Sequence, residues 1–344
     1  MSVDLPIVAA PMAGGPSTPA LVRAVAEAGG FGFLAGGYKS RESLAAEISH
    51  VREHTERFGV NLFVPSSASV DRTAFQNYAR HLQPEAEAYG IQLDLEPVAD
   101  DDRWAQKLAL LIEQPVPVVS LTFALPEPAV IAALQQAGSR VLMTVTTPTE
   151  ARQAEAAGVD GLIVQGPRAG GHSATFDPPR RIEDISTQDL VLQVREGTEL
   201  PIIAAGGVDG PAAVKELLDA GVQAVAVGTL LMRTDEAGTS DIHRRALTDP
   251  AFTETTLTRA FTGRLARALR NHFIDSHDAY AVDAYPAVHY LTKDLRQAAA
   301  KAGDAQGLHL WAGTGHRSAP RGPAADVIRW LGGIRAEPLA RLPE

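Results

Sequence analysis

Short runs of apolar residues recur along the first 230 positions and are separated by segments with helical spacing. Eight such runs are candidate strands, and most of them are nearly continuous rather than alternating, which is typical of strands buried on both faces of a parallel sheet. They lie at 7–12, 31–36, 59–64, 117–123, 140–146, 161–165, 201–205 and 224–228. The segments between them repeat apolar residues at helical intervals, for example Val214, Leu217 and Leu218. The pattern therefore predicts a repeated strand–helix unit.

An Ala-Gly pair stands between a predicted helix and the next strand at 28–29, 137–138, 157–158 and 220–221. Glycine is common just after a helix because it accepts positive φ. Proline at the first helical position marks helix starts at Thr18-Pro19 and Gly210-Pro211. Joints of one kind indicate a parallel sheet with helices outside it, and eight units predict an α/β fold, the (β/α)8 TIM barrel.

A doubly wound sheet is the competing parallel architecture, but it needs a nucleotide fingerprint after the first strand. The nearest glycine pattern, at 30–35, lies before and inside the second strand instead. We expect a barrel core at 1–235, interrupted by an irregular, helical insertion at 65–115. Residues 236–344 are expected to be a helical extension over the barrel mouth, in the same folding unit. The basic stretch 259–270 is interpreted as the surface of a helix.

The carboxyl ends of barrel strands build the active site of this fold. Here these ends carry no aspartate or glutamate, so we predict no metal site. A site with few reactive groups suggests that a bound cofactor supplies the chemistry.

The last two strands end in glycine-rich turns, where this fold usually holds a phosphate. The candidate cofactor residues there are Gly206, Gly207, Ala226, Val227, Gly228 and Thr229. The alternative is that these glycines only let helices pack on strands. Asn61 and Gln165 end two other strands, and their amides suit the alternating donors and acceptors of a flavin, although either amide could cap a loop. Met12 could contact a flavin ring or belong to the core.

His172 follows Gly170 and Gly171 just after the sixth strand, and it is the only histidine at these strand ends. Histidine transfers protons near neutral pH, so His172 is the candidate catalytic residue, although an isolated histidine is often structural. Tyr285, His289 and Lys293 are spaced at i, i+4 and i+8, and in a helix they would share one face. That face could meet an anionic substrate or be a solvated surface.

Composition narrows the choice of partners. The chain has 31 Lys and Arg against 41 Asp and Glu, a net charge of −10, which argues against nucleic acid or an anionic membrane surface. It has no cysteine, and neither a secretory signal nor a long apolar run is evident. We therefore expect a cytoplasmic enzyme with a small-molecule substrate.

The ordered motifs resemble the nitronate monooxygenase family, formerly called 2-nitropropane dioxygenase. The resemblance is carried by residues 10–15, 59–63, 165–172, 204–208, 228–229 and 258–264, and by the Tyr-Pro pair at 285–286. It implies an FMN-containing barrel that oxidises alkyl nitronates, typically propionate 3-nitronate, with O₂. It also implies that Gly170, with Gly171 beside it, contacts FMN, that His172 is the catalytic base, and that Tyr285 and Lys293 line the site.

Three positions depart from the family pattern. Pro167-Arg168 replaces a variable residue plus glutamate, Ser173-Ala174 replaces Arg-Gly, and Thr122, a candidate substrate residue, stands where some members have a second histidine. These departures put the substrate in question. The alternatives are an FMN-dependent NAD(P)H:quinone or enoyl-thioester reductase and, less favoured, a barrel that binds a phosphorylated metabolite without redox chemistry.

Overall fold

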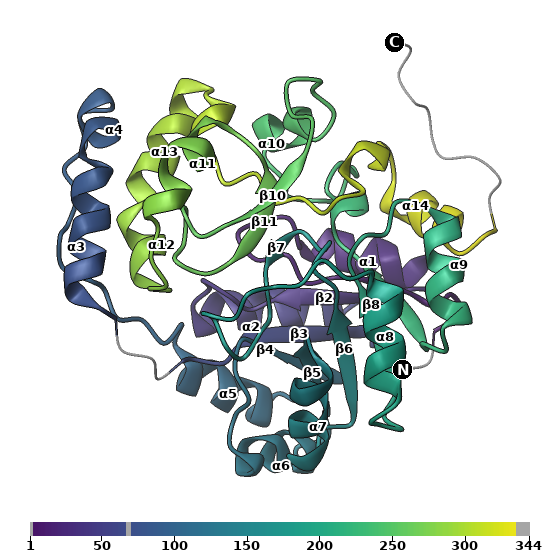
Figure 1. Cartoon of the computed structure of the whole chain (residues 1–344). Helices are drawn as coiled ribbons and strands as arrows, with labels where there is room; N and C mark the ends of the chain where they lie inside the picture. Colours follow the sequence, from purple (N-terminus) through teal and green to yellow (C-terminus); the bar gives the residue numbers. More distant parts are fainter. Residues whose placement is uncertain (1–2, 67–69, 335–344) are drawn as a thin grey trace.

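Eight parallel strands close into a barrel in the computed structural model, which describes residues 3–66 and 70–334 (Figure 1). Their order around the barrel follows the chain and confirms the predicted TIM barrel. All eight predicted strands are present, with bounds that differ by only a few residues. They are β1 (Ile7–Ala9), β2 (Phe31–Ala35), β3 (Phe58–Phe63), β4 (Val118–Thr122), β5 (Arg140–Val145), β6 (Gly161–Gln165), β8 (Ile202–Ala205) and β9 (Ala224–Val227).

The barrel strands are buried on both faces, which explains their continuous apolar runs. Val8, Phe33 and Ile203 belong to a cluster that fills the barrel interior. Their neighbours Ile7, Leu34 and Ile202 belong to a second cluster, formed between the strands and the surrounding helices. Because successive side chains point to opposite faces of a strand, both sets must be apolar.

Helices cover the outside of the barrel. They are α1 (Pro19–Glu27), α2 (Arg41–Arg52), α5 (Trp104–Glu113), α6 (Pro128–Gln136), α7 (Pro148–Ala156), α8 (Thr187–Arg195), α9 (Pro211–Asp219) and α14 (Ala324–Leu331). The Thr18 hydroxyl accepts a hydrogen bond from Leu21 N, which caps α1 in front of Pro19 as the sequence predicts. The glycines of all four Ala-Gly joints have positive φ, between +88° and +110°.

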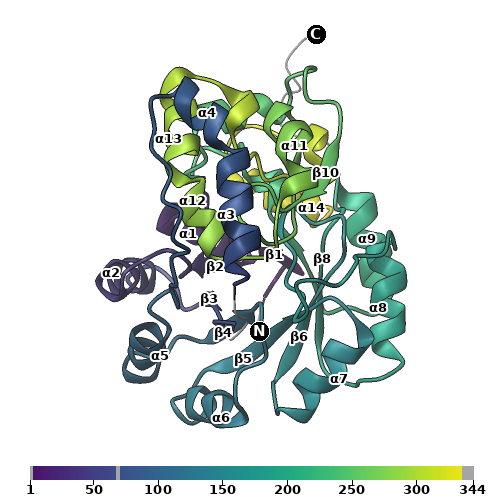
Figure 2. The same ribbon diagram turned by 60° about the vertical axis from the view of Figure 1, so that its left-hand side comes forward.

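The described part of the first insertion contains the helices α3 (Arg72–His81) and α4 (Gln83–Ala88). The helix α5 also falls within the range 65–115, but it packs on α2, α6 and β3 and is the barrel's own helix between β3 and β4. The part of this range that leaves the barrel therefore ends near Arg103. Figure 2 shows α3 and α4 standing beside α12 and α13, far along the sequence.

The C-terminal segment differs from the expected extension in two ways. First, α14 returns to the barrel and packs between α9 and α1, where the eighth helix of the fold belongs. Residues 232–323 are therefore an insertion between β9 and α14, and we call them the cap. Second, the cap contains strands as well as helices, because β10 (Thr255–Thr258) and β11 (Ala266–Leu269) form a sheet with β7 (Gly171–His172). The stretch 259–270 is thus a turn and a strand, and its interpretation as a helix is wrong.

The helices of the cap are short. They are α10 (Asp241–Ala246), α11 (His272–His277), α12 (Ala287–Leu291) and α13 (Lys293–Ala302), with 3₁₀ turns η1 (Thr229–Leu231), η2 (Asp278–Tyr280), η3 (Ala305–Gly307) and η4 (His316–Ser318) beside or among them.

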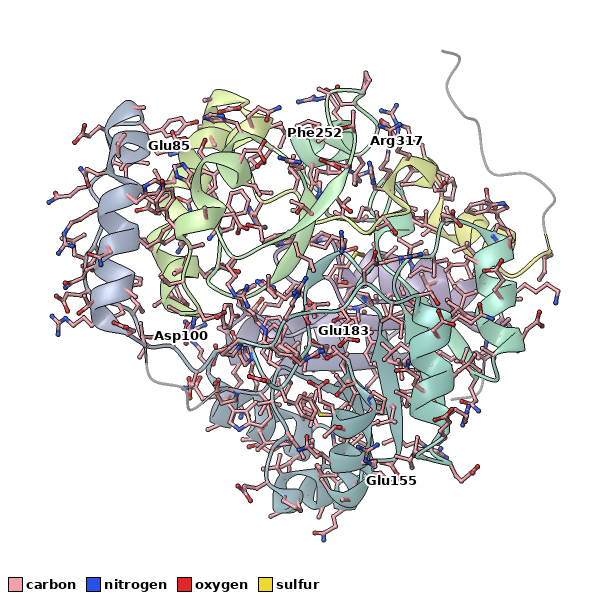
Figure 3. All side chains as sticks on the ribbon, in the orientation of Figure 1. Glu85, Asp100, Glu155, Glu183, Phe252 and Arg317 are labelled. Carbon is pink, nitrogen blue, oxygen red and sulfur yellow. The ribbon has the colours of Figure 1, made fainter. Side chains whose placement is uncertain are left out.

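An apolar cluster that contains Phe75, Phe261 and Val288 joins the first insertion to the cap. Tyr78 also donates a hydrogen bond to Ala260 O at 2.6 Å, and Glu85, labelled on α4 in Figure 3, meets His277 of α11. The two insertions therefore form one layer over the carboxyl ends of the strands. In the described ranges, no helix has the length and apolar character needed to cross a membrane.

Candidate active site

A cavity of about 880 Å³ lies between the carboxyl ends of the barrel strands and the cap. Apart from Tyr285, every residue that the sequence singles out for a site lines this cavity. We call the strand-end side the floor and the cap side the roof. The floor is formed by Met12, Asn61, Thr122, Gln165, Gly206, Gly207, Ala226, Val227, Gly228 and Thr229, and the roof by His289, Lys293, Arg296 and His309.

Parallel register brings the floor residues together. Asn61 pairs with Ser120 of the next strand, and Gln165 pairs with Ala205, which in turn pairs with Ala226. The side chains that end these strands therefore meet at one edge, although they are up to 165 residues apart in the chain.

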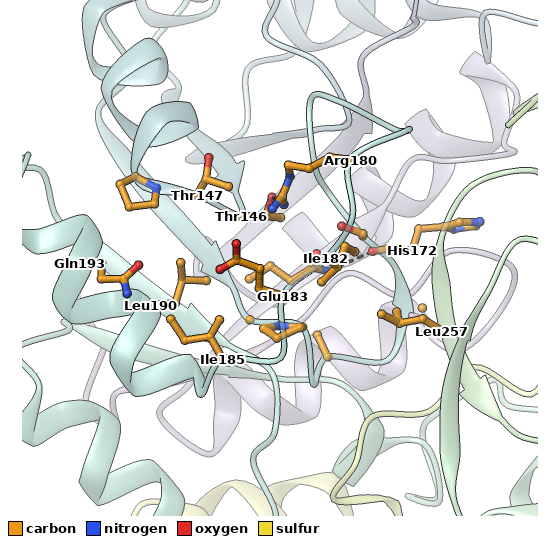
Figure 4. Close-up of a pocket in the computed structure, with 17 residues that line it drawn as sticks. Thr146, Thr147, His172, Arg180, Ile182, Glu183, Ile185, Leu190, Gln193 and Leu257 are labelled. Atoms are coloured by element: carbon orange, nitrogen blue, oxygen red, sulfur yellow. Dashed lines mark hydrogen bonds between the residues drawn. The ribbon is translucent and has the colours of Figure 1, made fainter.

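A second pocket of about 240 Å³ lies behind the loop 166–172 (Figure 4). Gln165, Gly171 and His172 line both spaces because this loop separates them. Figure 4 shows the imidazole of His172 directed away from the centre of the smaller pocket. We therefore assign the candidate site to the larger cavity.

The two amides of the floor are used differently. Asn61, which is only 4% exposed, donates through Nδ2 to the Ser120 hydroxyl and the Thr122 hydroxyl, each at 2.9 Å. Its Oδ1 accepts no hydrogen bond from any described residue. Gln165 instead binds the loop, because its Nε2 donates to His172 O at 3.1 Å and its Oε1 accepts from Ala174 N at 2.8 Å. The expectation that an amide could cap a loop holds for Gln165.

The glycine-rich turns leave backbone donors facing the cavity. Gly206 and Gly207 have φ of +109° and +77°, a conformation that favours glycine. The N–H groups of Gly207 and Gly228 donate to no other residue in the described ranges. The Thr229 hydroxyl accepts from Gly313 N at 3.0 Å, which leaves its own proton free to donate. Such a set of donors is suited to an anionic group.

Gly170 lines the cavity and also packs closely against the cap. A Cβ added at Gly170 would lie 2.5 Å from Gly313 N. The loop that carries His172 can therefore approach the cap segment around residue 313 only because position 170 has no side chain.

His172 is fixed by both its backbone and its ring. The backbone of His172 pairs with Ala266 in the sheet of the cap, and the ring Nε2 lies 2.9 Å from Thr262 Oγ1. The rings of Phe123, Tyr285 and Trp311 surround it, with centroids 5.3 to 5.7 Å away. Burial lowers the pKa of the His172 imidazole well below its usual range, and the charge of Arg264 lowers it further. His172 is therefore neutral at pH 7.

The predicted row of Tyr285, His289 and Lys293 is not one helix face. Tyr285 precedes α12, in a cis peptide bond with Pro286, while α12 and α13 meet at Thr292. His289 and Lys293 do line the cavity. Tyr285 lies behind them, where its ring contacts Phe123 and its hydroxyl donates to the Tyr38 hydroxyl at 3.2 Å.

The sequence does not single out two buried arginines beside the site. Arg296 lines the cavity at 7% exposure, donates to His289 O at 2.7 Å, and forms no ion pair with a carboxylate of a described residue. Arg264 lies behind Phe123, with its guanidinium carbon 4.1 Å from the ring centroid, and donates to the carbonyls of Ser173 and Thr175. Their burial becomes visible only in the folded structure, because an arginine in a sequence is ordinarily expected to lie on the surface.

Burial determines the charges in the roof and of Arg264 behind it. It lowers the pKa of both Arg264 and Arg296 to about 10, so both remain cationic at pH 7. Burial, with the charges of Arg296 and Lys293, lowers the pKa of His289 to about 3. Burial also lowers the pKa of His309 well below its usual range. The roof therefore carries fixed positive charge beside neutral imidazoles, and it can attract an anion.

Tyr38 is a further residue that the sequence does not single out. It has positive φ (66°), and Asp102 of the first insertion accepts a hydrogen bond from its backbone N–H at 2.8 Å. Its ring stacks on His289 at 4.6 Å between centroids. The first insertion thus supports the roof through Tyr38.

Arg168, where the sequence departs from the resembled pattern, also lines the cavity. A Cβ at Gly207 would lie 3.2 Å from Arg168 Cβ, so the arginine stem covers one glycine of the floor. Its guanidinium lies 3.9 Å from Asp184 in an exposed pair, which is worth little to stability.

The sequence profile of the nitronate monooxygenase family matches residues 2–332. A probable nitronate monooxygenase from Staphylococcus aureus (strain MSSA476) is 33% identical over 332 residues, covering 95% of this chain and 93% of that protein. The chain belongs to the nitronate monooxygenase family.

Solved structures agree with this membership. A nitroalkane oxidase from Streptomyces ansochromogenes has 48% sequence identity and a TM-score of 0.91, with 96% of each chain covered. FabK from Thermotoga maritima has 24% identity and a TM-score of 0.72 over 96% of this chain and 92% of that one, a likeness that concerns the fold alone. The resemblance inferred from the sequence is confirmed, and the protein is an enzyme of the nitronate monooxygenase family.

Proposed function

We propose that this enzyme oxidises alkyl nitronates of the propionate 3-nitronate type with O₂, in a reaction that depends on FMN, to a carbonyl compound and nitrite or nitrate. Family membership and the similarity to a nitroalkane oxidase support chemistry on a nitro compound. The proposed substrate is supported by the side chains of the roof. Arg296, buried and without a carboxylate partner among the described residues, faces a cavity that also holds the neutral His172.

The floor fits FMN. The cavity volume of about 880 Å³ lies in the upper part of the range of ligand sites and leaves room for a substrate beside a cofactor. The free N–H groups of Gly207 and Gly228 and the Thr229 hydroxyl would hold the phosphate. Asn61 Oδ1 would accept a hydrogen bond from the pyrimidine edge of the flavin. The Gln165 amide would contact the same edge while it also holds the loop. FMN bound in this way supplies the electron acceptor that none of these side chains can provide.

The residues of the roof have separate roles in this proposal. Arg296 attracts and orients the anionic end of the substrate, and Lys293, which is exposed, marks the entrance of the cavity. Tyr285, Phe123 and Trp311 exclude water from the imidazole of His172. His172 accepts a proton when the substrate arrives as a neutral nitroalkane.

The electrostatics favour the nitronate over the neutral nitroalkane. Cationic groups that stabilise an anion also make His172 harder to protonate, so His172 is a weak base in this site. A substrate that has already lost its proton avoids this difficulty. We therefore expect the preformed nitronate to react faster than the neutral compound.

Three measurements on the purified protein test the proposal. Its absorption spectrum should show a bound flavin that is released as FMN on denaturation. Under air, propionate 3-nitronate should yield nitrite. Without O₂, NADH should leave the flavin colour unchanged. Rapid bleaching by NADH together with no nitrite would overturn the proposal in favour of the reductase, and a colourless protein that takes up no FMN would favour the non-redox alternative.

A further inference from the structure

Among the residues that the structure describes, the ring of His172 forms one hydrogen bond, to Thr262 in the turn between β10 and β11. His172 Nε2 and Thr262 Oγ1 are 2.9 Å apart. Thr262 is only 1% exposed, and its hydroxyl also donates to the backbone carbonyl of Arg264 at 3.2 Å. The imidazole, the hydroxyl and the carbonyl therefore form a short chain closed to solvent.

The number of protons shared by these hydrogen-bonded groups selects one tautomer of the His172 imidazole. The Thr262 hydroxyl has one proton, and a neutral imidazole carries one N–H. The Arg264 carbonyl, in a residue that is 2% exposed, receives its hydrogen bond from Thr262 and from no other group that the structure describes. If the Thr262 hydroxyl donates its proton to this carbonyl, then Thr262 Oγ1 must accept a hydrogen bond from Nε2–H of His172. The reverse arrangement would leave a buried carbonyl without a donor, which is costly.

We propose that Thr262 is a positioning residue that holds His172 as the Nε2–H tautomer, so that Nδ1 presents the lone pair that accepts the substrate proton. The catalytic part of this inference rests on the proposed function. Nδ1 makes no hydrogen bond with any residue in the described ranges, whereas Nε2 is occupied. The low pKa of His172 supports a neutral ring with one defined tautomer.

The surroundings keep the ring in this orientation. The backbone of His172 is held by its pairing with Ala266 and by Gln165 Nε2, which donates to His172 O. Arg264 ties the same loop to the cap through the carbonyls of Ser173 and Thr175. With the backbone fixed on both sides, the hydrogen bond to Thr262 decides which ring nitrogen carries the proton.

The tautomer itself can be read without turnover. In protein labelled with ¹⁵N-histidine, long-range ¹H–¹⁵N spectra at pH 7 should show His172 with a protonated Nε2 and an unprotonated Nδ1, assigned by loss of the signals in His172→Gln. Thr262→Val, which keeps the shape but removes the hydroxyl, should give a mixture of tautomers. Thr262→Ser should restore the wild-type pattern. A protonated Nδ1 in the wild type, or an unchanged pattern in Thr262→Val, would overturn the proposal.

Kinetics test the catalytic part separately. In Thr262→Val, kcat/KM for a neutral nitroalkane should fall about tenfold, as expected for loss of one ordinary hydrogen bond, while kcat/KM for the matching nitronate changes little. Thr262→Ser should recover the rate. An equal loss for both substrates would contradict a role in proton transfer. If the spectra show the tautomer but no variant oxidises either substrate, the proposed function fails while the assignment of the tautomer holds.

Discussion

The floor of the cavity presents amides, glycines and backbone N–H groups, whereas the roof presents side chains that are charged or can become charged. The floor residues come from the ends of barrel strands, and their positions are set by the register of the sheet. The roof residues come from the insertion between β9 and α14, and Tyr38 and Asp102 support them from elsewhere in the chain.

The difference assigns cofactor binding to one side of the cavity and substrate selection to the other. A floor made of backbone and amide groups suits a polar, planar cofactor and depends little on pH. A roof with fixed positive charge selects the substrate that lies above it. A change in the roof should therefore leave cofactor binding unaffected, and a change in the floor should leave the choice of substrate unaffected.

The largest effect is expected where the roof meets the loop of His172. His172→Gln should lower kcat/KM for a neutral nitroalkane by about 100-fold or more, the usual contribution of a general base. The nitronate, which needs no deprotonation, should lose about tenfold or less. Steady-state nitrite assays with both substrates measure this ratio, and His50→Gln on the exposed face of α2 is the matched control. Equal losses would show that His172 does not act as a base.

Arg296→Gln should raise KM for propionate 3-nitronate about tenfold or more, because a charged hydrogen bond to the substrate is lost. The dissociation constant of FMN should stay within about twofold. Arg296→Lys, which keeps the charge, should fall between wild type and Arg296→Gln. Lys301→Gln on the exposed side of the same helix is the control. A loss of FMN affinity with an unchanged KM would reverse the assignment of floor and roof.

Thr229→Val tests the floor. Removing the hydroxyl should weaken FMN binding about tenfold, because a hydrogen bond to the charged phosphate is lost, and leave KM for the nitronate unchanged. Fluorescence titration of the apoprotein with FMN measures this change. Thr229→Ser should bind FMN as the wild type does, and the account is contradicted if riboflavin, which lacks the phosphate, loses affinity to the same extent as FMN.

The smallest effect concerns stability and pH. His289 has a pKa of about 3 when folded and about 6.5 when unfolded, so below pH 6.5 the unfolded chain binds the extra proton and the free energy of unfolding falls. Between pH 7 and 6 this one group should lower stability by about 0.7 kcal/mol. His289→Gln should remove that part of the difference in urea unfolding, whereas His50→Gln should not. Equal pH dependence in both variants would contradict burial of a neutral His289.

The barrel could be predicted from the sequence because its signal is local. Each strand is a short apolar run, four of the joints carry a glycine with positive φ such as Gly29 or Gly221, and helices begin at Thr18-Pro19 and Gly210-Pro211. The cap could not be predicted in the same way. The return of α14 to α1 depends on packing across about 300 residues, and β10 and β11 are four-residue strands without a distinctive pattern.

The site divides in the same way. Asn61, Gln165 and Thr229 are recognisable because strand ends of this fold meet at one edge. Arg264 and Arg296 are not, since nothing in one sequence separates a buried arginine from an exposed one. The expected face of Tyr285, His289 and Lys293 was partly wrong because Thr292 lies between two short helices and Tyr285 precedes them. The roles of these residues in binding stay predictions.

The ratio of initial nitrite release from propionate 3-nitronate and from freshly dissolved neutral 3-nitropropionate, at equal concentration under air, tests the central claim most directly. The positive roof and the weak base His172 predict a higher rate for the nitronate, by about tenfold or more. Equal rates, or a faster reaction with the neutral compound, would contradict a site built for a preformed anion.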